Sequence, residues 1–157
     1  MHVLVAVNES ETSQYALSWT LEHLIPKQGS SFKLTLLTVV EPPGQAAYYY
    51  AASGPIYSSS FLEELNAKAD EAARELLKKF KAQVHGHDPS LPVELIIGKG
   101  EVRDELVDYA DSAAVDLLVV GSRGLGALKR TFVGSSSDYA VHHCHCPVLV
   151  VKRPSHQ

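Results

Sequence analysis

The strongest constraint on the fold of this chain is a repeated alternation between short apolar runs and segments with helical spacing. Runs that are apolar at successive positions are typical of strands buried on both faces of a sheet. The predicted strands cover residues Val3–Val7, Phe32–Val40, Pro92–Ile97, 116–121 and 146–152. Because helical segments separate these strands, the sequence predicts an α/β fold with an open five-stranded parallel sheet and helices on both faces.

The segments between the strands place apolar residues on one helical face. The first helix follows from Leu17, Leu21 and Leu24, which are spaced i, i+4 and i+7. The second is predicted from a capping box at Ser60 and Glu63 to about residue 84, the third over 102–113 and the fourth over 135–144. Residues 42–60 are rich in Gly, Ser, Ala, Pro and Tyr without a period, so they predict a long mobile loop, and residues 98–100 predict a turn.

Length and charge limit the functional classes that fit this chain. A chain of 157 residues without an internal repeat predicts one domain over residues 1–157. The net charge of −4 does not fit a basic nucleic-acid module, and the sequence has no apolar stretch long enough to suggest a signal peptide or a membrane span. Cys144 and Cys146 are too close in sequence to cross-link distant parts of the fold. We therefore expect a cytoplasmic protein without nucleic-acid or membrane partners.

The predicted topology also indicates where a ligand would bind. In open parallel sheets, ligands bind beyond the carboxyl ends of the strands, where the winding direction of the sheet reverses. The candidate site therefore includes the strand tails, which are 6–8, 38–40, 97–98 and 120–121.

The most informative segment runs from Gly121 to Ser137 and joins a predicted strand to a predicted helix. Its glycines allow close approach to a ligand, and three serines open the helix, whose N–H groups and dipole attract an anion. Arg123, Lys129 and Arg130 add positive charge. The segment therefore predicts a phosphate cradle, although it matches neither the Walker A motif nor the dinucleotide fingerprint.

The segment does match the pattern G-x2-G-x9-G-[ST], with Gly121, Gly124, Gly134 and Ser135 at its fixed positions. In this pattern the chain resembles the nucleotide-binding branch of the universal stress protein family. The resemblance extends to VLVAVNESETSQYAL near the start and to DLLVVGSRGLG and CPVLVVKR near the end. The sequence GSRGLG and the long insert before the second helix are most similar to those of plant members of the family.

This resemblance implies a Rossmann-like fold of the adenine nucleotide alpha hydrolase type, with strand order 3-2-1-4-5. It also implies a two-fold homodimer paired through the fifth strand, Cys146–Lys152, and bound ATP or AMP with Mg²⁺ on the phosphates. The matching binding residues are Ala6, Val7, Asn8, Val39, Val120, Gly121, Arg123, Gly124, Gly134, Ser135, Ser136 and Ser137. Many ATP-binding members have Asp where this chain has Asn8, and Asn is a poor ligand for Mg²⁺.

Several alternatives stay open at the level of sequence. Asn8 could cap the first helix rather than contact a ribose. The cluster from His142 to Cys146 contains metal-ligating residue types, but its spacing favours a helix end followed by a buried cysteine. For the whole protein, the expected function is a dimeric stress-response module that binds an adenine nucleotide. The alternatives are a weak ATPase or phosphotransferase that uses the same site, and a nucleotide-free chaperone or interaction scaffold.

Overall fold

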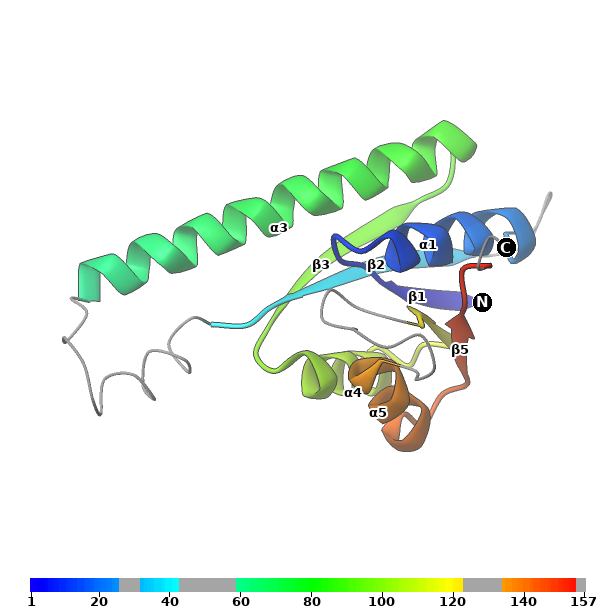
Figure 1. Ribbon diagram of the computed structural model, residues 1–157. Coiled ribbons are helices and arrows are strands. Elements are labelled where there is room, and N and C mark those ends of the chain that lie inside the picture. The colour runs from blue at the N-terminus through cyan, green and yellow to red at the C-terminus, as the bar shows by residue number, and fades with distance from the viewer. Residues whose placement is uncertain (26–31, 43–58, 123–133, 155–157) are drawn as a thin grey trace.

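The computed structural model describes residues 1–25, 32–42, 59–122 and 134–154. It contains a five-stranded sheet in the order β3-β2-β1-β4-β5, and every neighbouring pair of strands is parallel (Figure 1). The strands are β1 (His2–Ala6), β2 (Lys33–Val40), β3 (Val93–Lys99), β4 (Leu117–Gly121) and β5 (Val148–Val151). The predicted α/β class and strand order are confirmed.

The helices cover both faces of this sheet. Helices α1 (Glu11–His23) and α3 (Ser59–His87) lie on one face, while α4 (Val102–Ser112) and α5 (Ser135–His143) lie on the other (Figure 1). Each face has its own apolar cluster. The α1/α3 side includes the fully buried side chains of Leu17 and Phe80, and the α4/α5 side includes Leu106 and Leu118.

The winding of the sheet reverses between β1 and β4. The crossovers from β1 to β2 and from β2 to β3 pass over one face in one direction. The chain then returns through α4 to the other side of β1, where Val3, Leu4 and Val5 pair with residues 117–119 of β4. The carboxyl ends of β1 and β4 consequently adjoin at the point where ligands bind in folds of this type.

Some predicted boundaries were wrong. Helix α3 already includes Ser59, so Ser60 lies within the helix rather than capping it, and the helix continues past Val84 to His87. Gly98 belongs to β3 rather than to a turn, because it pairs with Val39 in the parallel ladder. Strand β5 is shorter than predicted at both ends. Of the predicted loop over 42–60, residues 43–58 lie outside the described residues.

A polar network crosses the amino ends of three strands. The ring Nε2 of His2 lies 2.8 Å from the hydroxyl of fully buried Thr35, which donates to Glu94 at 3.1 Å. Glu94 also pairs with Lys33 at 2.9 Å. Burial of the imidazole, and next the Lys33 ammonium, lower the pKa of His2 from its usual 6.5. The folded protein therefore favours the neutral ring.

This network predicts a pH-dependent stability. The pKa of His2 is lower in the folded state than in the unfolded state, so the neutral ring favours the folded protein. The contribution of His2 to the free energy of unfolding is therefore fully present above about pH 6.5 and decreases as the pH falls below that value. Urea unfolding midpoints measured at about pH 7.5 and about pH 5.5 should differ more for the native chain than for His2→Gln. Equal pH dependence of the two proteins would contradict a coupling between His2 and folding.

Candidate functional site

The carboxyl end of β1 opens a gap in the backbone ladder. Pairing between β1 and β2 extends to Ala6 opposite Leu37, and the Val7 N–H then donates to the Leu37 carbonyl at 2.8 Å. In a parallel ladder, residues two apart direct their backbone groups towards the same neighbouring strand. Val39 therefore points its N–H and C=O towards the space beyond β1, and no backbone group of the described residues pairs with them there. One donor and one acceptor are thus available at this edge.

Three of the predicted residues line this gap on its apolar side. Ala6, Val39 and Val120 pack in the same cluster as Leu106 of α4. Val120 is only 4% exposed, whereas Ala6 and Val39 are partly buried. The strand ends therefore offer an apolar floor beside the free backbone groups of Val39, which is the combination that a flat heterocycle requires.

Asn8 has a different local role from the cap that the sequence left open. The cap of α1 is Ser10, whose hydroxyl accepts from the Ser13 N–H at 3.2 Å. The Asn8 Oδ1 accepts from both the N–H and the hydroxyl of Ser10, at 3.0 and 2.6 Å. Asn8 therefore fixes the residue that caps the helix. Its side-chain oxygen is already used twice, so the side-chain N–H groups are what Asn8 can offer a ligand.

Gly121 ends β4 directly against the first turn of α1. A Cβ added at Gly121 would lie 2.9 Å from the carbonyl carbon and oxygen of Thr12 and 3.1 Å from the backbone nitrogen of Ser13. Such contacts with backbone atoms cannot be relieved by a side-chain rotation. Gly121 is consequently required for the packing of α1 against β4, whether or not a ligand is present.

The start of α5 is tied to the same edge. The Gly134 N–H donates to the Ser122 carbonyl at 2.8 Å, and the Ser122 N–H donates to the Val151 carbonyl at 2.9 Å. Gly134 is the N-cap residue of α5 and provides no side-chain cap. The first N–H groups of a helix have no partner within the helix, so this end can bind an anion.

The three serines that open α5 differ in their surroundings. Ser135 is exposed and Ser136 is half-buried, so both can face a ligand. Ser137 is only 4% exposed, and its hydroxyl donates to the Gly134 carbonyl at 2.8 Å. A contact from Ser137 to a phosphate would therefore come from its backbone N–H rather than from its hydroxyl.

The topology brings most of the predicted site to one edge of the sheet. The residues at this edge are Ala6, Val7, Asn8, Val39, Val120, Gly121, Gly134, Ser135, Ser136 and Ser137. Arg123 and Gly124 lie outside the described residues. Glu105 of α4 is half-buried beside Gly98, a contact between distant segments that no local sequence pattern predicted.

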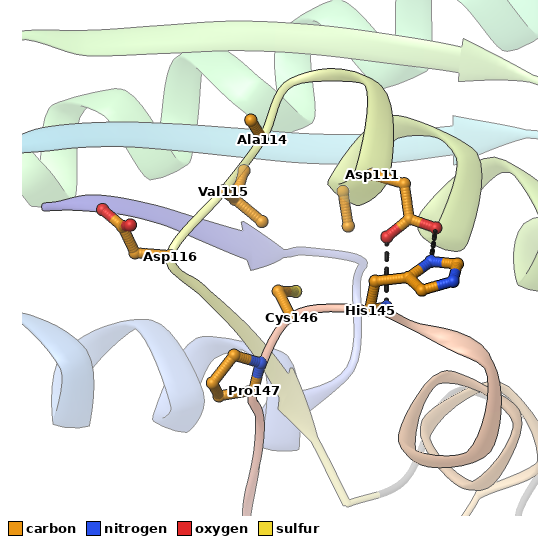
Figure 2. Close-up of a pocket in the computed structure, with 8 residues that line it drawn as sticks. Asp111, Ala114, Val115, Asp116, His145, Cys146 and Pro147 are labelled. Atoms are coloured by element: carbon orange, nitrogen blue, oxygen red, sulfur yellow. Dashed lines mark hydrogen bonds and ion pairs between the residues drawn. The ribbon is translucent and has the colours of Figure 1, made fainter.

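A shallow hollow of about 520 Å³ lies at the opposite, amino edge of β4 and β5 (Figure 2). There the Asp111 carboxylate accepts from the backbone N–H and the ring Nδ1 of His145, at 3.1 and 2.7 Å. Hydrogen bonds from His145 lower the pKa of Asp111. This hollow is remote from the strand ends that form the candidate site, and it contains none of the predicted binding residues.

The cluster from His142 to Cys146 is divided between elements. The rings of His142 and His143 donate to carbonyls one turn earlier in α5, while His145 faces Asp111. Burial raises the pKa of the Cys144 thiol to about 11, so the thiolate that zinc binds is disfavoured at neutral pH. Within the described ranges, no three His, Cys, Asp or Glu side chains converge as metal ligands.

Comparison with known proteins identifies the family. The family model of the universal stress protein family matches residues 1–152 of this chain. The universal stress protein A-like protein of Arabidopsis thaliana is 32% identical, covering 96% of this chain and 89% of the relative. The universal stress protein Sll1388 of Synechocystis is 30% identical, and the alignment covers 96% of both chains.

Solved structures agree with this identification. The hypothetical protein MJ0577 of Methanocaldococcus jannaschii has a TM-score of 0.79 at 26% identity, covering 99% of this chain and 97% of its own. The Arabidopsis protein At3g01520, solved with AMP bound, has a TM-score of 0.69 at 26% identity, covering 99% and 93%. In the described part of this chain, no helix combines the length and apolarity that a membrane crossing requires. The chain belongs to the universal stress protein family.

Proposed function

We propose that this chain binds an adenine nucleotide, AMP or ATP, at the carboxyl edge of β1, β2 and β4, and acts as a binding and regulatory module in a stress response. The observation that carries the proposal is the start of α5, where a helix without a side-chain cap is tied through Gly134 to the end of β4. That helix end favours a phosphate at the point where the sheet reverses. An Arabidopsis relative with the same fold was solved with AMP bound.

The strand ends suit the other two parts of the nucleotide. The Watson–Crick edge of adenine carries one acceptor, N1, beside one donor, the exocyclic amine. The free N–H and C=O of Val39 match that pair. In the proposed complex the amide N–H groups of Asn8 would donate to the ribose. The residues proposed to hold the ribose and phosphates are Gly121, Arg123, Gly124, Gly134, Ser135, Ser136 and Ser137. In this arrangement Ala6, Val7 and Val120 contact the adenosine.

A binding module fits this site better than an efficient hydrolase. Hydrolysis of ATP usually requires a divalent ion held next to the phosphates. The side-chain oxygen of Asn8 already accepts two hydrogen bonds from Ser10, so it is poorly placed to ligate Mg²⁺ as well. A magnesium ion would then be held by the phosphates rather than by Asn8.

The direct test is calorimetric titration of the purified chain with AMP and with ATP, together with native mass spectrometry of the protein as purified. Saturable binding of an adenine nucleotide, or a co-purified mass increment equal to one, supports the proposal. Absence of binding up to millimolar nucleotide, in a protein shown by circular dichroism to be folded, would remove it in favour of a nucleotide-free scaffold.

We further propose that the module is a homodimer paired through β5. Among the strands that the structure describes, β5 has a neighbour on one side only, and its residues Val148, Leu149 and Val150 are each only partly buried. An apolar edge strand is an aggregation hazard unless something pairs with it. Antiparallel pairing of residues 146–152 with a second copy of the chain would cover this edge.

Leu149→Glu should convert the dimer into monomers, because it places two carboxylates in an apolar interface without partners. Sedimentation velocity at micromolar concentration measures the change. Ala82→Glu adds the same charge at an exposed position of α3, away from β5, and should leave the dimer intact. A native chain that sediments as a stable monomer would overturn this interface.

A further inference from the structure

Two cysteine side chains lie together where α5 leads into β5. Cys144 is the C-cap residue of α5, and Cys146 follows two positions later, before β5 begins. The chain bends at residues 145 and 146, and both cysteines pack against the apolar cluster on the α4/α5 face of the sheet. His145, between them, turns its ring to Asp111 of α4 instead. The two sulfur atoms therefore lie on the same side of a short, bent segment.

The two thiols are in direct contact, and they are not equivalent. Burial raises the pKa of both, to about 11 at Cys144. The Cys144 S–H donates a hydrogen bond to the Cys146 sulfur, which adds to the rise in the pKa of Cys144 and opposes the rise at Cys146. The backbone N–H groups of Leu118 and of Cys146 itself also oppose the rise at Cys146. Cys146 is therefore the thiol that ionises more readily.

Cys146 is also the thiol that a reagent can reach. Its side chain lines the open hollow of about 520 Å³, together with Val115 and Pro147 (Figure 2). Cys144 is not among the described residues that line this hollow. Because Cys146 packs on the α4/α5 face, a second copy paired along the outer edge of β5 would leave its thiol in the hollow. The structure thus presents one accessible thiol with a second thiol directly behind it.

We propose that Cys144 and Cys146 form a reversible intrachain disulfide by exchange with a low-molecular-weight disulfide such as oxidised glutathione, with Cys146 as the attacking thiol. Residues two apart in a bent segment lie within the roughly 4.4–6.8 Å between Cα atoms that a disulfide spans. This inference is independent of the proposed nucleotide site, which lies at the opposite edge of the sheet.

The exchange takes place in two steps. The Cys146 thiolate attacks one sulfur of oxidised glutathione, and the first glutathione leaves as a thiolate that takes up a proton. Cys144 then gives its proton to solvent and attacks the Cys146 sulfur of the mixed disulfide, which releases the second glutathione. The two protein thiols lose two electrons and two protons in total, and one glutathione disulfide becomes two glutathione thiols.

The test is reaction of the reduced chain with oxidised glutathione, followed by alkylation of the remaining thiols and mass spectrometry. The native chain should lose both alkylation sites without retaining glutathione, and dithiothreitol should restore both. Cys144→Ser should stop at the mixed disulfide and retain one glutathione. In Cys146→Ser, glutathionylation should be about tenfold slower than in Cys144→Ser, because Cys144 is less ionised and does not line the hollow.

The same reactions in urea are the control, since unfolding removes the difference in burial and the two single variants should then react at similar rates. Circular dichroism verifies the fold of each variant. A native chain that stays reduced, or that retains one glutathione, would overturn the intrachain disulfide, and so would disulfide-linked dimers on a non-reducing gel. Equal rates for the two folded variants would show that Cys146 is not the preferred attacking thiol.

Discussion

Replacing Gly134 with valine is expected to abolish AMP binding while leaving the sheet folded. Gly134 has φ −63° and ψ 150°, a conformation open to any residue, so its backbone does not require glycine. A β-branched side chain there would stand in front of the free N–H groups of α5, where the proposed phosphate lies. Loss of two hydrogen bonds to a charged ligand would weaken binding by roughly 100-fold or more.

Calorimetry with AMP measures this effect, and circular dichroism verifies the fold. The matched control is Gly86→Val, because a Cβ at Gly86 would have nothing within 4 Å. Gly86 lies in the last turn of α3, away from the candidate site, so the control should bind AMP like the native chain. Native affinity in a folded Gly134→Val protein would show that this loop only connects β4 to α5.

Gly121→Ala is expected to have the opposite signature, a loss of stability even without nucleotide. The added Cβ would meet the backbone of Thr12 at 2.9 Å, so α1 would have to move away from β4. Overpacking of this kind typically costs about 1–3 kcal/mol. The free energy of unfolding in urea should therefore decrease, with AMP absent from the buffer.

Gly86→Ala is the control for this experiment, since alanine in an open helical position should stabilise the chain by about 0.4–1 kcal/mol. A Gly121→Ala protein with native stability would show that α1 adjusts freely, and any loss of AMP binding would then reflect the ligand alone. The two glycines share one sequence motif, yet the structure assigns one to packing and leaves the other free to contact a ligand.

The sequence by itself determined the architecture and the location of the candidate site. Strands buried on both faces have continuous apolar runs, and helices buried on one face have apolar residues spaced three or four positions apart. Both patterns are local in the sequence. The glycine motif from Gly121 to Ser135 led to the correct family and to the edge where β1 and β4 adjoin. These inferences needed no knowledge of which distant residues touch.

Tertiary structure alone decided which side chain takes each role at that edge. Asn8 and Ser10 are both good helix caps, and only the geometry of the first turn selects Ser10. Gly98 belongs to a Gly-Lys-Gly sequence that is typical of a turn, but its pairing with Val39 places it in β3. Because Gly98 has no side chain, the carboxylate of Glu105 from α4 can lie beside it. These roles depend on the space between residues that are far apart in the chain. A local sequence pattern does not determine that space.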